Sequence, residues 1–221
     1  MTVRTRILAV ASIAILAASA VSPASAAPSP EQRMLTEKDV PASFGTPKSR
    51  DFDAKTVDTT IGICSSADGT TRVSVPAPPT QYIVDIETAN KKTYTEVMER
   101  VYQFATPKDA TDAFNSLFTN LSKCDGTTTL TQSGPDLTQT VTTGSYPGGE
   151  YADFWVNVQG TWRGAPECKK PCRTVVQALY VQAGNAIVET SAYINGKGQL
   201  TGQQRNQLAD LAEVLGARWA S

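Results

Sequence analysis

Any acid–base chemistry in this chain must come from residues other than histidine, because none of its 221 residues is a histidine. Histidine is the commonest general base and metal ligand at neutral pH. Its absence argues against a Ser-His-Asp device and a zinc site, so we expect no catalytic residue, no metal and no cofactor. Paired carboxylates could still hydrolyse a glycosidic bond, although no pattern here separates their pKa values. The candidates are Asp85, Glu87, Glu96 and Glu99.

The strongest candidate for a binding surface is the basic segment of residues 160–173, GTWRGAPECKKPCR. A disulfide between Cys168 and Cys172 would clamp it as a rigid turn, which lowers the ordering cost of binding. Cations beside an aromatic ring could bind an anionic envelope polymer or an acidic protein. The alternative is a solvated connection that needs its charge to stay in water. The candidate residues are Trp162, Arg163, Lys169, Lys170 and Arg173.

Aromatic residues around a predicted strand at residues 152–158 form a second candidate surface. Alternation puts Phe154, Val156 and Val158 on the inward face of this strand and Trp155 on the other face. If no helix covers that other face, it is a binding surface lined by Tyr146, Tyr151 and Trp155. The alternative, which we favour, is that Trp155 packs as core under Tyr180 or Tyr193.

The N-terminus predicts export. Residues 1–26 have a basic start, an apolar run over residues 7–21 and a small-residue cleavage site at Ala24-Ser25-Ala26, which is typical of a signal peptide. We expect a flexible tail at residues 27–34 and a single domain at residues 35–221 that is secreted, with possible attachment to the cell wall. No membrane insertion is expected after cleavage. The formal net charge of −1 predicts no affinity for nucleic acid.

Four cysteines in an exported chain predict two disulfides. Of the three possible pairings we favour Cys64–Cys124 and Cys168–Cys172. The first disulfide would stabilise the folded state by about 4 kcal/mol in the chain-entropy model, because it closes a long loop. A redox role for the second pair is the alternative, but its spacing is not that of a thioredoxin motif.

Two helices and a hairpin are the clearest predicted elements. Thr106 as N-cap and Pro107 at the first turn open a helix over residues 107–121. Thr201 and Gln204 fit a capping box that opens a closing helix. Gly184-Asn185 predicts a tight turn between strands 174–183 and 186–194, with Val181 opposite Val188 and Leu179 opposite Thr190. The apolar stripe of the first helix is Ala110, Ala113, Phe114, Leu117, Phe118 and Leu121.

The fold class predicted by these elements is α+β, with one mostly antiparallel twisted sheet of about six or seven strands and two main helices on one of its faces. A short helix is expected in residues 35–44, and residues 48–60 show no clear pattern. The remaining expected strands are residues 71–75, 81–88, 94–104, 127–131 and 137–142.

The pattern resembles the extracellular sensor domain of PknH-type actinobacterial membrane kinases and related exported proteins. Three stretches carry the resemblance: VYQFATPKDA at residues 101–110, the helix that runs to CDG at residues 124–126, and NAIVET at residues 185–190 before a closing helix. The resemblance covers residues 35–217. It implies a mixed α/β domain with two disulfides, a surface cleft, and binding of a ligand or signal outside the cell, and it supplies no catalytic residue.

The function predicted from the sequence is therefore a secreted, non-enzymatic, sensor-like binding domain. Its partner would be an extracellular small molecule, an envelope polymer or a protein. One alternative is a protease inhibitor that presents Lys169 or Lys170 to a protease of trypsin-like specificity. Another is a carboxylate-based hydrolase that acts on an envelope polysaccharide.

Overall fold

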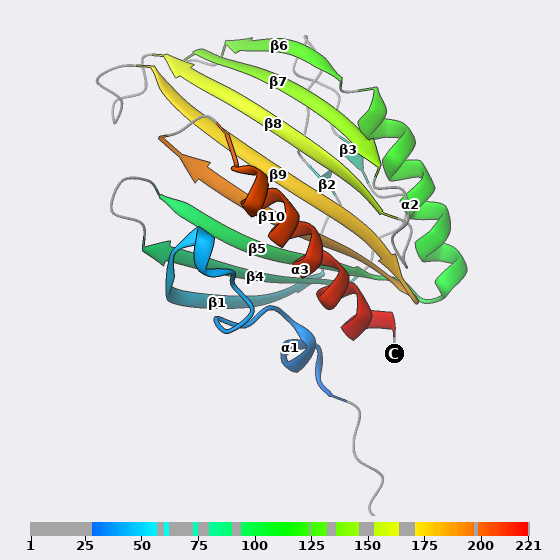
Figure 1. The fold of residues 1–221 in the computed structure, drawn as a ribbon. Coiled ribbons are helices and arrows are strands. Elements are labelled where there is room, and N and C mark those ends of the chain that lie inside the picture. The colour runs from blue at the N-terminus through cyan, green and yellow to red at the C-terminus, as the bar shows by residue number, and fades with distance from the viewer. Residues whose placement is uncertain are drawn as a thin grey trace, which may run out of the picture.

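The structure is a computed structural model that describes residues 28–56, 60–61, 73–74, 80–89, 94–123, 125–131, 136–145, 153–163, 171–196 and 199–220. Its main feature is an eight-stranded antiparallel sheet with strand order β1-β4-β5-β10-β9-β8-β7-β6 (Figure 1). The strands are β1 (Thr46–Thr56), β4 (Thr80–Ala89), β5 (Thr95–Gln103), β6 (Gly126–Thr131), β7 (Asp136–Ser145), β8 (Asp153–Arg163), β9 (Cys172–Ala183) and β10 (Ala186–Asn195).

Two longer helices, α2 (Pro107–Ser122) and α3 (Gly202–Ala220), accompany the sheet. The predicted α+β class is confirmed, with eight strands in place of six or seven. The small elements are α1 (Pro30–Arg33), a 3-10 turn η1 (Ala42–Phe44), and the paired strands β2 (Thr60–Ile61) and β3 (Val73–Ser74).

The β9–β10 hairpin has the predicted register. Val181 is opposite Val188, and Leu179 is opposite Thr190. Gly184 in the turn has a φ of +55°, which glycine adopts without steric cost. The capping box of α3 is also confirmed, because Thr201 N–H donates to Gln204 Oε1 at 3.0 Å and Gln204 N–H donates to Thr201 Oγ1 at 3.1 Å.

The two longer helices lie on opposite faces of the sheet, so the prediction that they share one face is wrong. Leu208 and Leu215 of α3 pack with Leu179 of β9, whereas Leu117 of α2 packs with Tyr180 of the same strand. Successive side chains of a strand point to opposite faces. The physical reason is that β9 is apolar on both sides, so it needs a cover on each.

The N-terminal segment also differs from its prediction. Residues 35–41 do not form the predicted helix, and the one helical turn in residues 35–44 is the 3-10 turn η1. Thr36 instead donates from its backbone N–H and its hydroxyl to one carboxylate oxygen of Asp39, both at 2.8 Å, which closes a turn. Asp39 is held in turn by Arg218 of α3, at 2.6 Å.

Two further differences concern segments with weak local patterns. Within the predicted tail, residues 30–33 form α1, and Met34 is fully buried. Strand β1 forms where no element was predicted, because pairing with β4 stabilises it. Among the described residues, no helix combines the length and apolar character that crossing a membrane requires.

Candidate binding pocket on the open sheet face

Within the described part of the chain, no helix lies over one part of the sheet face that carries α3. Helix α3 packs on β9 and β10, so the same face of β7 and β8 lies open beside it (Figure 1). A pocket of about 390 Å³ lies at this boundary. We call it the open-face pocket, and its described lining residues are Thr142, Trp155, Asn157, Gln159, Gln177, Gln199, Leu200 and Arg205.

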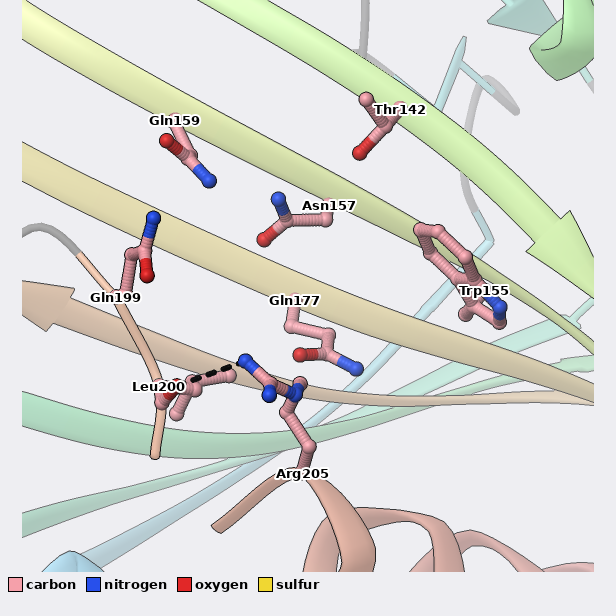
Figure 2. Close-up of a pocket in the computed structure, with 8 residues that line it drawn as sticks. All are labelled: Thr142, Trp155, Asn157, Gln159, Gln177, Gln199, Leu200 and Arg205. Carbon is pink, nitrogen blue, oxygen red and sulfur yellow. Dashed lines mark hydrogen bonds between the residues drawn. The ribbon is translucent and has the colours of Figure 1, made fainter. Parts of the chain in front are cut away.

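The sheet register explains why these side chains meet. Thr142 of β7 pairs with Asn157 of β8, and Asn157 pairs with Gln177 of β9. Directly paired residues project to the same face. The floor of the pocket is therefore a row of polar side chains that crosses three strands. Trp155 and Gln159 flank Asn157 at the alternate positions of β8, so the indole ring lies beside this row (Figure 2).

The remaining lining residues come from the segment that leads into α3. Arg205, in the first turns of α3, donates from Nη1 to the carbonyl oxygen of Leu200 at 3.0 Å (Figure 2). This bond fixes the guanidinium at the rim of the pocket. Leu200 is buried and anchors the segment, while Gln199 beside it is exposed.

The amide side chains on the floor of the pocket have no side-chain hydrogen-bond partner among the described residues. Gln177 is only 3% exposed. No side-chain hydrogen bond joins Asn157, Gln159 or Gln177 to another residue in the part of the chain that the structure describes. Asn157 and Gln159 are half-buried, so the hydrogen-bonding groups of this row face the pocket rather than other described side chains.

Trp155 is held over Gly144 of β7. The two residues are direct partners in the sheet, and a Cβ atom added at Gly144 would lie 2.5 Å from the indole ring. The absence of a side chain at position 144 therefore creates the space that the ring occupies. Trp155 is half-buried and packs against the core cluster under α3, as the favoured alternative expected, but Tyr180 belongs to the cluster on the other face, so the predicted packing against that tyrosine is wrong.

Gly144→Ala is expected to displace the Trp155 indole, because the new methyl group and the ring cannot share this space. We expect a loss of about 1–3 kcal/mol in the free energy of unfolding, the usual cost of overpacking. Urea denaturation would measure the loss, and the near-ultraviolet circular dichroism of the tryptophans would report the ring's displacement. Unchanged stability together with an unchanged spectrum would contradict this placement of Trp155.

Only part of the predicted basic segment lies within the described residues, so its role as a binding surface stays a prediction. Arg163 ends β8 and Arg173 lies near the start of β9, and both are exposed. The strands therefore extend further into this segment than predicted. Trp162 lies in β8 opposite Cys172. Lys169, Lys170, Tyr146 and Tyr151 lie outside the described residues.

The four candidate carboxylates are divided between the two faces. Glu99 is fully buried on the face that carries α3. Glu96 is on the opposite face, where it is paired in register with Glu87. None of the four is among the described lining residues of the open-face pocket, so the arrangement does not favour a carboxylate hydrolase.

Of the four cysteines, the structure describes Cys172, which is disulfide-bonded. Cys64, Cys124 and Cys168 lie outside the described residues, so both predicted pairings stay predictions. No group of three or more acidic or cysteine side chains among the described residues could hold a metal ion.

Sequence reasoning identified Trp155 and missed the rest of the pocket. The available signal was Gln177, a polar residue inside the apolar stretch from Val175 to Val181 of β9. No sequence pattern indicated Gln199 or Arg205 as pocket residues, because only the path of the chain after β10 brings them to β8 and β9.

These features define an α+β domain with a polar pocket on one face of its sheet. The chain belongs to the PknH-like extracellular domain family, whose family model matches residues 25–213. It is similar in fold to the crystal structure of the extracellular domain of PknH from Mycobacterium tuberculosis. That match has a TM-score of 0.53 and 17% sequence identity, and it covers 85% of this chain and 94% of that one. No curated protein matches the chain.

Proposed function

We propose that this chain is an exported, sensor-like domain that binds a small polar molecule outside the cell in the open-face pocket. The observation that carries the proposal is the row of amides without partners, which includes the almost fully buried Gln177. The pocket volume of about 390 Å³ is within the range of about 300–1,000 Å³ that small-molecule sites occupy. Membership of an extracellular domain family supports the location.

The proposed role is binding without catalysis. The described lining residues include no carboxylate, lysine, tyrosine or cysteine. General acid–base catalysis uses these groups or histidine, and a hydroxyl such as that of Thr142 needs such a base to become a nucleophile; the chain has no histidine. Amides and a threonine hydroxyl suit recognition, because they donate and accept hydrogen bonds without changing charge.

The proposal includes the processing of the chain. Residues 1–26 are removed as a signal peptide, and residues 35–221 act as one domain with the disulfides Cys64–Cys124 and Cys168–Cys172. The domain then acts in the cell envelope or the medium.

Native mass spectrometry of the protein recovered from the medium of its native host tests the proposal. We expect a ligand-bound species whose excess mass disappears on denaturation. Gln177→Leu should reduce this species at least tenfold, because it removes an amide from the pocket and keeps the volume similar. Gln139→Leu is the matched control, since Gln139 is also buried in the sheet but lies on the opposite face.

Two results would overturn the proposal. One is a bare native mass for the wild-type protein across preparations. The other is an excess mass that persists equally in Gln177→Leu, which would place the ligand elsewhere. Circular dichroism of each variant would exclude unfolding as the cause of a loss.

A further inference from the structure

The side chains of the open-face pocket also define the chemical class of its ligand. We propose that the pocket binds an uncharged sugar unit, either free or as part of an envelope polysaccharide. This inference rests on the proposed binding function and narrows it to one class of molecule.

The charges of the lining residues do not suit a charged ligand. No described lining residue is acidic, so a cationic ligand would have no counter-charge. One lining residue is basic, namely Arg205, and its Nη1 is already bound to the Leu200 carbonyl oxygen. Tight anion sites commonly use a bidentate arginine or several cations. A single exposed arginine at the rim therefore suits a neutral polar molecule better than a phosphate or a carboxylate.

The hydrogen-bonding capacity of the floor excludes apolar ligands. Asn157, Gln159 and Gln177 each carry one acceptor oxygen and two donor hydrogens, and none has a described side-chain partner. An aliphatic ligand would strip water from three amides and leave them without hydrogen bonds, which is unfavourable at each amide. Sugar hydroxyls both donate and accept, so they complement amides in either orientation.

The spacing of the amides fits a ring with hydroxyls around its edge. Adjacent strands lie about 4.8 Å apart, which is the separation expected across the Asn157–Gln177 pair. Alternate residues of one strand lie about 7 Å apart, which separates Asn157 from Gln159. A row with these spacings can contact several hydroxyls of one or two rings at once.

Trp155 supplies the apolar part of a sugar site. A sugar ring has polar edges but its C–H groups form apolar faces, and a flat indole can cover such a face while amides bind the edge. Trp155 is next to Asn157 on the same face of β8 (Figure 2). Because Gly144 has no side chain, the indole ring has room to lie beside the row of amides. An aromatic platform beside an amide row is the arrangement that a hydroxyl-rich ring requires.

Saturation-transfer NMR and isothermal titration calorimetry of the mature protein would test the proposal. The probes are unbranched di- and trisaccharides of glucose, mannose, galactose, arabinose and N-acetylglucosamine. Glucuronate, glucose 6-phosphate and octanoate serve as charged and apolar comparisons. We expect millimolar or tighter binding of at least one neutral saccharide and at least tenfold weaker binding of the comparisons.

Substitutions then locate the binding. Asn157→Leu, Gln177→Leu and Trp155→Ala should each weaken the saccharide at least tenfold, whereas Trp155→Phe should restore most of the affinity because it keeps a ring. Gln139→Leu, on the opposite face, should change nothing. Binding that ignores these substitutions would overturn the proposal.

The result also separates the two proposals. If no neutral saccharide of the panel binds, but the protein from its host carries a small molecule that Gln177→Leu removes, the pocket binds ligands and the sugar class is wrong. If neither saccharides nor a native ligand depend on Gln177, both proposals fail.

Discussion

Glu189→Ala is expected to lower the free energy of unfolding by about 3–5 kcal/mol, the usual cost of breaking a buried ion pair from one side. Glu189 on β10 is 4% exposed. Its Oε2 accepts a hydrogen bond from Nη1 of Arg100 on β5 at 3.2 Å. Removal of the carboxylate would leave the arginine's charge in the sheet without its partner.

The surroundings of this pair make the loss large. Burial raises the pKa of Glu189, and Arg100 opposes that shift. Tyr102 and Tyr180 are also buried here, and burial together with the Glu189 carboxylate raises the pKa of both, so they stay neutral. Phe154 stacks on Tyr180 with ring centroids 4.9 Å apart. Water therefore has little access to the Glu189 end of the pair, while the Arg100 side chain is 25% exposed.

Chemical denaturation of the wild type and four variants would measure the effect. Arg100→Met should cost a comparable amount, and the double variant of Glu189→Ala and Arg100→Met should lose much less than the sum of the two single losses. Asp112→Ala is the control, because Asp112 pairs with the solvent-exposed Lys108 on α2 and should change stability little. Additive losses would show that Arg100 and Glu189 do not act as a pair.

Glu99→Gln is expected to stabilise the protein at pH 8 by about 3 kcal/mol and to leave its stability at pH 4 nearly unchanged. Burial raises the pKa of Glu99 from 4.5 to about 7. Its Oε2 accepts the Leu35 N–H at 2.5 Å, while its Oε1 is buried without a hydrogen-bond partner. In Glu99→Gln, the amide oxygen of the new side chain can accept the same hydrogen bond from the Leu35 N–H without carrying a charge.

The direction in which stability changes with pH follows from the linkage between proton binding and folding. Between pH 4.5 and 7 the folded protein holds a proton on Glu99 that the unfolded chain has released, so stability falls as the pH rises through this window. At about 1.36 kcal/mol per pKa unit, the full cost is about 3 kcal/mol above pH 7. Arg218 and Asp39 are the charged groups that face Glu99, and both are unchanged in the variant.

Urea denaturation from pH 4 to pH 8 would measure the difference between the two proteins. Glu213→Gln, on the exposed side of α3, is the matched control and should follow the wild type at every pH. A constant difference between Glu99→Gln and the wild type across this range would mean that Glu99 does not titrate as described.

The sequence by itself determined the elements whose causes are local. Thr201 and Gln204 make a capping box within one turn of chain, and Gly184 provides the turn whose length fixes the register of β9 against β10. The stripe of α2 and the alternation of β8 depend on periodicity alone. Such features need no knowledge of distant residues, so they could be predicted.

The tertiary structure alone decided which parts meet. An amphipathic stripe shows that a helix must be covered but not by which face of a sheet, so only the packing on Leu179 and on Tyr180 separates α3 from α2. Arg100 and Glu189 are 89 residues apart in the chain. The amide row likewise needs the pairing of three strands, because long-range contacts depend on the arrangement of the whole sheet and leave no periodic mark on any one segment.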